Sequence, residues 1–347
     1  MNLKEAQERA FKINLDNAKK AEKEIALLYK KAYQDILSEL KVLYKQIEKV
    51  DPKDYYNYTI KIRRLEKMQK EIVLTINNTY PDIMNQVRLN SLKSFTNQYY
   101  MDQYIMDWFS IKDFTFTFVN KTAANVSTWW TSDVWKRIKE DAQKAGQYKG
   151  YVPKWGNQGT TLKKLLLTNK SKQIKWIKNS VSNGLIQGKS VAQTARLMQN
   201  AFDQSYRNSI RVARTETIRN LNAASYLNNQ NLRSQGILIN RMWLAVHDTR
   251  TRLQSAMMDG QLADPVSGMF TYPNGAQGLF PGQSGYPFYD INERCTTIEV
   301  LEGQPPELRR AKNPITGKSE VMSFRNFKDY QEEHGLIYTN GSWAPKK

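Results

Sequence analysis

The stretch Arg211-Val-Ala-Arg-Thr-Glu-Thr-Ile218 is the first of four polar motifs in the second half of this 347-residue chain. The second is Asp248-Thr-Arg-Thr-Arg252, which follows Trp243 by five positions. The third is Asp259-Gly-Gln261, and the fourth is Asn292-Glu-Arg-Cys295. None of the four is a common catalytic signature, so their meaning depends on the elements that carry them.

Upstream of these motifs, the spacing of apolar residues is typical of helices. Apolar residues recur every three or four positions over residues 25–50, and residues 5–50 are predicted to form one long amphipathic helix. Pro52 should end it, since proline disfavours helical geometry at the residue before it. A second stripe covers residues 58–76, and we expect Pro81 to mark its end and a third helix to follow over 82–110. The first two helices should pack as an antiparallel hairpin.

Glycines and a proline make residues 146–160 a predicted loop and a candidate domain boundary. Two or three helices are expected after it, over residues 161–186, 190–202 and 203–230. Ser190 is a candidate N-cap, because a serine hydroxyl can accept a hydrogen bond from the first free amides of a helix.

After Gly236 the pattern changes to short strands, expected at residues 237–239, 242–246 and 296–301. A short helix is expected between Asp248 and Met257, with Asp248 or Thr249 as its N-cap and Gly260 at its end. Residues 264–290 are rich in glycine, proline and tyrosine and predict an irregular loop.

The sequence therefore predicts an α+β protein that is mostly helical. Its expected parts are a helical N-terminal region at 1–110 with a long hairpin, a basic helical middle at 111–235, a small α+β domain at 236–302, and a linker and tail at 303–347 that carries a short helix near Phe327.

The charge of the chain is unevenly distributed. The net charge is +19, and residues 111–240 hold 21 Lys and Arg against 6 Asp and Glu, a difference of +15. Residues 142–202 contain eleven basic residues and no acidic one. A solvated helical face normally mixes both signs, so this segment points to phosphate backbones. A basic surface that serves solubility or meets an acidic protein is the alternative.

Non-specific binding of double-stranded DNA is accordingly expected along this segment. The residues expected to contact DNA are Lys163, Lys164, Lys170, Lys172, Lys175, Lys178, Lys189 and Arg196.

Several classes of site are poorly supported. The single cysteine, Cys295, excludes an internal disulfide and a zinc site of three or four cysteines, and it fits assembly in a reducing cytoplasm. Only two histidines are present, His247 and His334. Phosphate-binding loops and dinucleotide fingerprints are lacking, so neither a metal nor a cofactor is expected. Neither a signal peptide nor a membrane-spanning segment is expected.

In this order, the four motifs resemble the head-morphogenesis domain of tailed-phage minor head proteins, the phage Mu F-like family. The resemblance covers about residues 160–300. It implies a virion protein inside the capsid, assembled in the host cytoplasm, with portal, scaffold or capsid proteins as partners and possible contact with packaged DNA. The motif residues would then be structural. They are Arg214, Glu216, Trp243, Asp248, Arg250, Arg252, Asp259, Gly260, Asn292, Arg294 and Cys295.

The chain departs from the family pattern at two positions. Ser255 stands where family members commonly have histidine, and Glu293 stands where they commonly have cysteine. Both departures remove residues suited to acid–base or metal chemistry, so no catalytic residue is expected. The alternatives are a DNA-binding protein unconnected with capsids and a nuclease-like enzyme of RNase-like fold.

Within the motifs, Arg214 and Glu216 are expected to reach the small C-terminal domain. Glu216 should neutralise at least one of Arg250, Arg252 or Arg294, because it is the only acidic residue between Asp203 and Asp248. Pairing with Arg219 on its own helix is the other option.

Overall fold

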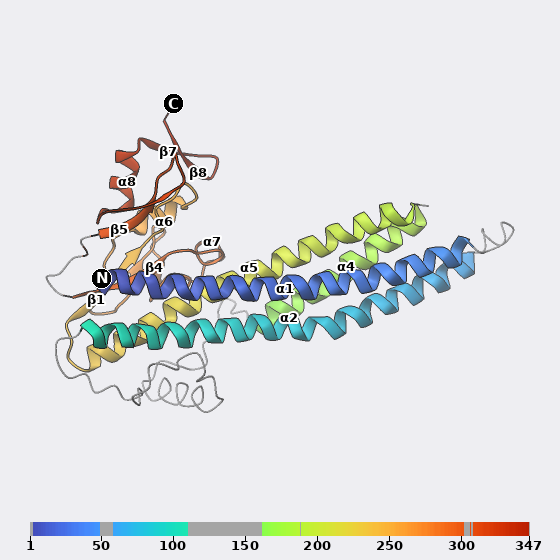
Figure 1. Cartoon of the computed structure of the whole chain (residues 1–347), viewed down its shortest axis with the longest axis horizontal. Coiled ribbons are helices and arrows are strands. Elements are labelled where there is room, and N and C mark those ends of the chain that lie inside the picture. Colours follow the sequence, from blue (N-terminus) through green and yellow to red (C-terminus); the bar gives the residue numbers. More distant parts are fainter. Residues whose placement is uncertain are drawn as a thin grey trace. The chain divides into compact units, whose positions relative to one another are not determined.

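The computed structural model (Figure 1) describes residues 3–48, 58–109, 162–187, 189–301, 306 and 308–346. Long helices make up the first part of the chain, and short strands and helices make up the last part. This confirms the predicted α+β class with a long helical N-terminal region. The predicted loop at 146–160 lies outside the described residues.

The chain forms two compact units. One, called here the bundle unit, comprises Ala18–Asn90 and Thr161–Arg214. The other, called the mixed unit, comprises Met1–Asn17, Ser91–Thr160 and Thr215–Lys347. The domain ranges expected from the sequence stay a prediction.

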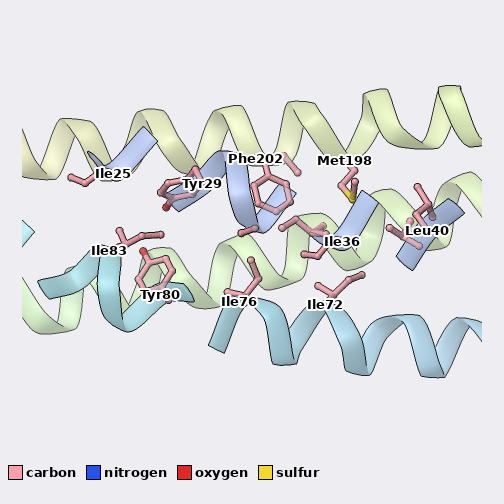
Figure 2. Packing of buried hydrophobic residues seen from close by; sticks show 14 of the residues in the cluster. Ile25, Tyr29, Ile36, Leu40, Ile72, Ile76, Tyr80, Ile83, Met198 and Phe202 are labelled. Carbon is pink, nitrogen blue, oxygen red and sulfur yellow. The ribbon is translucent and has the colours of Figure 1, made fainter. Parts of the chain in front are cut away.

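The bundle unit is built from parts of four helices: α1 (Leu3–Glu48), α2 (Tyr58–Phe109), α4 (Leu162–Ile186) and α5 (Val191–Ser234). Helix α1 contains neither glycine nor proline, which favours an unbroken helix. The apolar stripes of α1 and α2 meet α4 and α5 in one core, where Ile36, Leu40 and Ile72 are completely buried. Figure 2 shows these side chains pointing toward those of Met198 and Phe202. The stripes predicted from the sequence are therefore the contact faces of this bundle.

Helix α2 continues through Pro81, so the prediction that Pro81 ends a helix is wrong. The predicted second and third helices are one element. Pro81 and Asp82 are exposed, whereas Tyr80 and Ile83 beside them are buried in the core. Solvent can hydrogen-bond the carbonyl that the proline leaves without a partner, and the packing of Tyr80 and Ile83 offsets the cost of the ring.

Helices α4 and α5 form a tight hairpin that depends on two features, the cap at Ser190 and the close approach at Gly184. The Ser190 hydroxyl accepts a hydrogen bond from Gln193 N at 3.3 Å, and Gln193 Oε1 accepts one from Ser190 N at 2.9 Å. This reciprocal pair confirms Ser190 as the N-cap. Gly184 lies against Thr194, whose Oγ1 would be only 2.2 Å from an added Cβ, so a side chain there would force the helices apart. The segments 190–202 and 203–230 form the single helix α5, so the smaller of the two helix numbers expected here is the one observed.

The mixed unit contains a small sheet with helices around it. Strand β1 (Ile239–Leu244) pairs antiparallel with β4 (Thr296–Leu301). The strand expected at 296–301 is confirmed, and the strands expected at 237–239 and 242–246 are the single strand β1. Between them lie α6 (Leu253–Met258), β2 (Phe270–Thr271), β3 (Gln277–Gly278) and α7 (Pro287–Asp290). Residues 264–290 are largely irregular, as expected. They nevertheless bury Phe270, Tyr272 and Tyr289 against Trp243.

The segment predicted as a linker is folded instead over residues 308–346. It holds β5 (Leu308–Lys312), β6 (Ser319–Ser323), α8 (Phe327–Glu333), β7 (Leu336–Thr339) and β8 (Ser342–Pro345). Only α8 was expected from the sequence. The two hairpins bury few apolar residues of their own. They are held by backbone bonds to the preceding domain, such as Trp343 N to Thr249 O at 2.8 Å and Lys312 N to His247 O at 2.9 Å.

The bundle core gives a direct test of the stripe on α1. Leu40→Ala removes a completely buried side chain and should lower the free energy of unfolding by about 2–5 kcal/mol. Leu27→Ala, on the same helix but 59% exposed, should change it by less than about 0.5 kcal/mol. Urea denaturation followed by circular dichroism measures both. Equal effects of the two substitutions would contradict the packing described here.

Candidate functional site

One face of α5 holds the segment that carries the Asn292-Glu-Arg-Cys295 motif. Thr215 Oγ1 accepts a hydrogen bond from Asn292 N at 3.1 Å. Arg219 Nε donates to Gly282 O at 2.6 Å. Asn222 Nδ2 donates to Pro281 O at 3.3 Å and to Cys295 O at 3.0 Å. Residues at helical spacing on α5 therefore supply the partners of a backbone that has little regular structure.

Glu216 pairs with Arg219 of its own helix, at 2.6 Å between Oε1 and Nη1, and both side chains are almost completely buried. The expectation that Glu216 neutralises Arg250, Arg252 or Arg294 is wrong. Burial raises the pKa of Glu216 to about 7, Arg219 opposes the rise, and the nearby Asp290 adds to it. The Arg214-Thr-Glu-Thr217 motif thus reaches the C-terminal segment through its own Thr215, and the neighbouring Arg219 adds a second contact.

Arg214 belongs to the bundle unit. Its guanidinium makes two hydrogen bonds of 2.7 Å to the carboxylate of Glu22 on α1. The side chain is 61% exposed. The expectation that Arg214 fixes the C-terminal domain is therefore wrong.

Asp248 organises the turn after β1. Its carboxylate receives two bonds from the guanidinium of Arg294, at 2.7 and 2.8 Å, and one from Arg250 N at 2.9 Å. Burial alone would raise the pKa of Asp248, but the bonds from Arg294 and Arg250 hold it below its ordinary value. Arg250 itself is largely exposed, with its Nη2 3.7 Å from Asp248. Asp248 is not the N-cap of α6, which begins after Arg252 without a side-chain cap.

Arg252 joins α6 to the fourth motif. Its guanidinium donates to Glu293 Oε2 at 2.6 Å and to the carbonyls of Phe288 and Tyr289 at the end of α7. Ser255 Oγ lies 3.4 Å from both carboxylate oxygens of Glu293. Ser255 and Glu293, the two positions at which the chain departs from the family pattern, therefore face each other. An ion pair to Arg252 neutralises the carboxylate of Glu293.

Asp259 is buried between β1 and the C-terminal hairpin. It accepts from Ala245 N at 2.6 Å, lies 2.8 Å from His247 Nε2, and pairs with Arg309 Nη1 at 2.7 Å. Burial would raise its pKa, yet His247 and Arg309 hold the value below the ordinary range. Gly260 has a φ of 83°, which confirms the predicted left-handed turn after α6. Arg309, which joins the C-terminal hairpin to this carboxylate, was not singled out from the sequence.

Trp243 and Cys295 belong to the apolar core of this region. The Trp243 ring packs edge-on against Phe270 and Tyr272, with centroids 5.2 and 5.5 Å apart. Cys295 is buried in the same core, and burial raises the pKa of its thiol well above the ordinary value. A thiol in this state is a poor nucleophile.

The motif residues therefore build a scaffold. Asp248, Asp259, Glu216 and Glu293 each pair with an arginine within 2.7 Å. Among the described residues, no three His, Cys, Asp or Glu side chains are grouped so as to hold a metal ion. Carboxylates that are buried and neutralised in this way are not available as general bases for an exposed substrate.

The basic residues form a separate surface on α4. Helix α4 has six lysines and no acidic residue. Lys164, Lys172 and Lys175 are exposed, opposite the buried Leu166 and Ile177.

The remaining predicted DNA contacts differ in exposure. Arg196, near the start of α5, is exposed, and Lys170, Lys178 and Lys189 are half-buried. The side chain of Lys163 lies outside the described residues.

A family model described as "Phage Mu protein F like protein" matches residues 175–298, which include all four motifs. Over these residues the chain is similar to the phage Mu F-like family. The match begins within α4 and ends within β4, so it includes the face of α5 that holds the fourth motif.

Two curated relatives share parts of this chain. It is 33% identical over 188 residues to the NAD(+)–arginine ADP-ribosyltransferase EFV of Enterococcus faecalis, which is 54% of this chain and 37% of that protein. It is 27% identical over 173 residues to the minor head protein GP7 of Bacillus phage SPP1, which is 50% of this chain and 55% of that protein. The chain thus spans about a third to a half of the relatives it matches. No solved structure matches it.

Two glutamate–arginine pairs of this chain differ in burial, so substitution of each glutamate tests what burial contributes to stability. Glu216→Ala leaves the Arg219 charge buried and should lower the free energy of unfolding by about 3–5 kcal/mol, and Glu216→Gln by less. Glu22→Ala, which breaks the solvent-exposed pair with Arg214, should cost under about 1 kcal/mol. Thermal and urea denaturation measure all three. A Glu216→Ala protein as stable as the wild type would refute the buried role.

Proposed function

We propose that this chain is a minor head protein of a tailed phage that acts in head assembly inside the capsid. The observation that carries the proposal is the family match over residues 175–298, the segment whose motifs build the interior of the mixed unit. The name of the phage SPP1 relative supports it. Portal, scaffold or capsid proteins are the partners that this function implies.

Purified heads test the location. The protein should be detected in heads by immunoblotting, and it should survive external protease until the heads are opened. Heads that assemble and package DNA without it, or a protein that external protease removes, would overturn the proposal. The first result would favour a DNA-binding protein unconnected with capsids, and the second would place the protein on the outer surface of the head.

We propose further that the exposed face of α4 contacts packaged DNA. Lys164 and Lys175 are eleven positions apart, about 16 Å along a helix that rises about 1.5 Å per residue. Trp176, the single aromatic residue of α4, packs against the bundle core. It is therefore not presented for stacking on bases, which favours phosphate contacts with duplex over binding of single strands.

The lysine face predicts binding that is independent of sequence and sensitive to salt. Changing Lys164, Lys172, Lys175 and Lys178 together to Glu should abolish most of the affinity for a random duplex in a filter assay. Each lost phosphate contact should reduce the slope of log K against log salt by about 0.9.

The matched control changes Lys20, Lys23, Lys31 and Lys41 to Glu. These are exposed on α1, where acidic residues are interspersed, and the variant has the same net charge. Equal loss in both variants would show that total charge, and not the α4 face, governs binding. Absence of binding at low salt would refute the DNA contact.

The buried, arginine-paired carboxylates predict that the protein lacks hydrolytic activity. Incubation with labelled DNA and RNA, with Mg²⁺, Mn²⁺ or Zn²⁺, should leave both intact. Cleavage that disappears in Asp248→Ala would establish a nuclease. Transfer of label from NAD⁺ to arginine would instead extend to this chain the activity for which the Enterococcus faecalis relative is named.

Among the described residues, the structure contains no helix long and apolar enough to cross a membrane. The proposal therefore includes no membrane partner.

A further inference from the structure

Two buried clusters in the mixed unit each contain two carboxylates and one guanidinium. The first, called the 216 cluster, consists of Glu216, Arg219 and Asp290. The second, called the 299 cluster, consists of Asp102, Glu299 and Arg241. Each of these six residues is at most 6% exposed.

The 216 cluster lies where α5 holds the loop before α7. Arg219 binds Glu216 and the carbonyl of Gly282. Asp290 accepts bonds from Ser284 N and Oγ, at 2.9 and 2.7 Å, and from Gly285 N at 3.0 Å. Both carboxylates are close enough to interact electrostatically with Arg219. One guanidinium thus serves two carboxylates that fix the same loop.

The 299 cluster lies where the ends of α1 and α2 meet β4. Gln98 and Ser225 donate to the two oxygens of Asp102, at 2.7 and 2.5 Å. Gln7 donates to Glu299 Oε2 at 3.1 Å and accepts from Glu299 N at 3.3 Å. The bonds to Asp102 join α2 to α5, and the bonds to Glu299 join α1 to β4.

Arg241 supplies the positive charge of the 299 cluster. It acts electrostatically on Glu299 and lies over the ring of Tyr226, 4.7 Å from the centroid. Arg233 and Tyr226 are the other ionisable groups that affect it. The three buried members of the cluster carry a net charge of minus one when both carboxylates are ionised; Arg233, which acts on Arg241, is only half-buried.

An uncompensated charge in a protein interior is costly, and a buried acid avoids the cost by keeping its proton. Each cluster has one carboxylate more than it has guanidinium groups. We propose that each cluster holds one proton in the native state. The mixed unit therefore takes up two protons on folding, and the hydrogen bonds around each cluster loosen when its proton is lost.

The electrostatics agree with the charge count. Burial raises the pKa of Asp102 to about 7, with the bonds from Ser225 and Gln98 opposing the rise. Burial also raises the pKa of Glu299 well above its ordinary value, and Asp102 adds to this effect. Carboxyl groups whose pKa is raised in the native state contribute stability that is complete below about pH 4. That stability is lost as the pH rises through about 7.

Native-state hydrogen exchange at several pH values tests the proposal within the intact chain. Protection factors, corrected for intrinsic exchange, should fall for the amides of β1 and β4 between pH 5 and pH 8. Two protons give a fall of up to about a hundredfold per pH unit, and one proton up to about tenfold. Amides of α4 in the bundle unit serve as the internal reference and should fall much less.

Carboxamide variants test whether the slope comes from the carboxyl groups of these clusters. Glu216→Gln and Asp102→Asn should each reduce the slope by about one proton, and the double variant should flatten it. Glu332→Gln, at an exposed position of α8, should leave the slope unchanged. Protection of β1 and β4 that does not fall with pH overturns the proposal, as does a slope that persists in Glu216→Gln. These two results do not depend on whether Asp102→Asn folds.

Discussion

The guanidinium of Arg219 is the contact on which the arrangement of the motifs depends. It donates to Gly282 O and to Glu216, and it is almost completely buried. The segment from residue 281 to 295 has only the single turn of α7 as regular structure, so its position comes from partners on α5. Once that segment is held, Arg294 reaches Asp248, and Glu293 reaches Arg252. The second and fourth motifs thus form one connected set of charged contacts, whereas Asp259 of the third motif pairs separately with Arg309.

The two units of the chain are stabilised by different means. In the bundle unit, Ile36, Leu40 and Ile72 pack in a continuous apolar core, which tolerates changes that conserve volume. In the mixed unit, much of the interior consists of arginines and carboxylates whose hydrogen bonds require defined geometry. Removing one member leaves a charge without a partner, so such networks tolerate substitution poorly. Because the mixed unit needs particular polar residues, its sequence shows recognisable motifs. The bundle unit needs only apolar residues at helical spacing, so its sequence shows a periodic pattern.

The periodic features were predictable and the exceptions were not. The stripe through Ile36 and Leu40, the cap at Ser190 and the turn at Gly260 each follow from local rules. Helix α2 runs through Pro81 because packing on both sides outweighs a local preference, and local sequence does not report packing. The partner of Arg214 was missed for a similar reason. Glu22 is 192 residues away, and charge matching alone gave no means of choosing it.

The C-terminal hairpins show a further limit of local patterns. Strand β5 contributes Arg309 to Asp259, but an arginine between Leu308 and Arg310, in a segment after two prolines, gave no sign of burial. The charge on α4 was visible in the sequence, and the structure adds which lysines share its exposed face. The DNA contact itself stays a prediction.

The bond between Gln7 and Glu299 joins residues 292 positions apart and bears on the order of folding. During synthesis from the N-terminus, every residue of the bundle unit is available once residue 214 has emerged. The first turns of α1 must wait for β4, almost three hundred residues later. Closure of so long a loop is slow, and unpaired polar groups stay hydrated until it occurs. The bundle unit should therefore fold first on the ribosome, and the N-terminal turns should dock last.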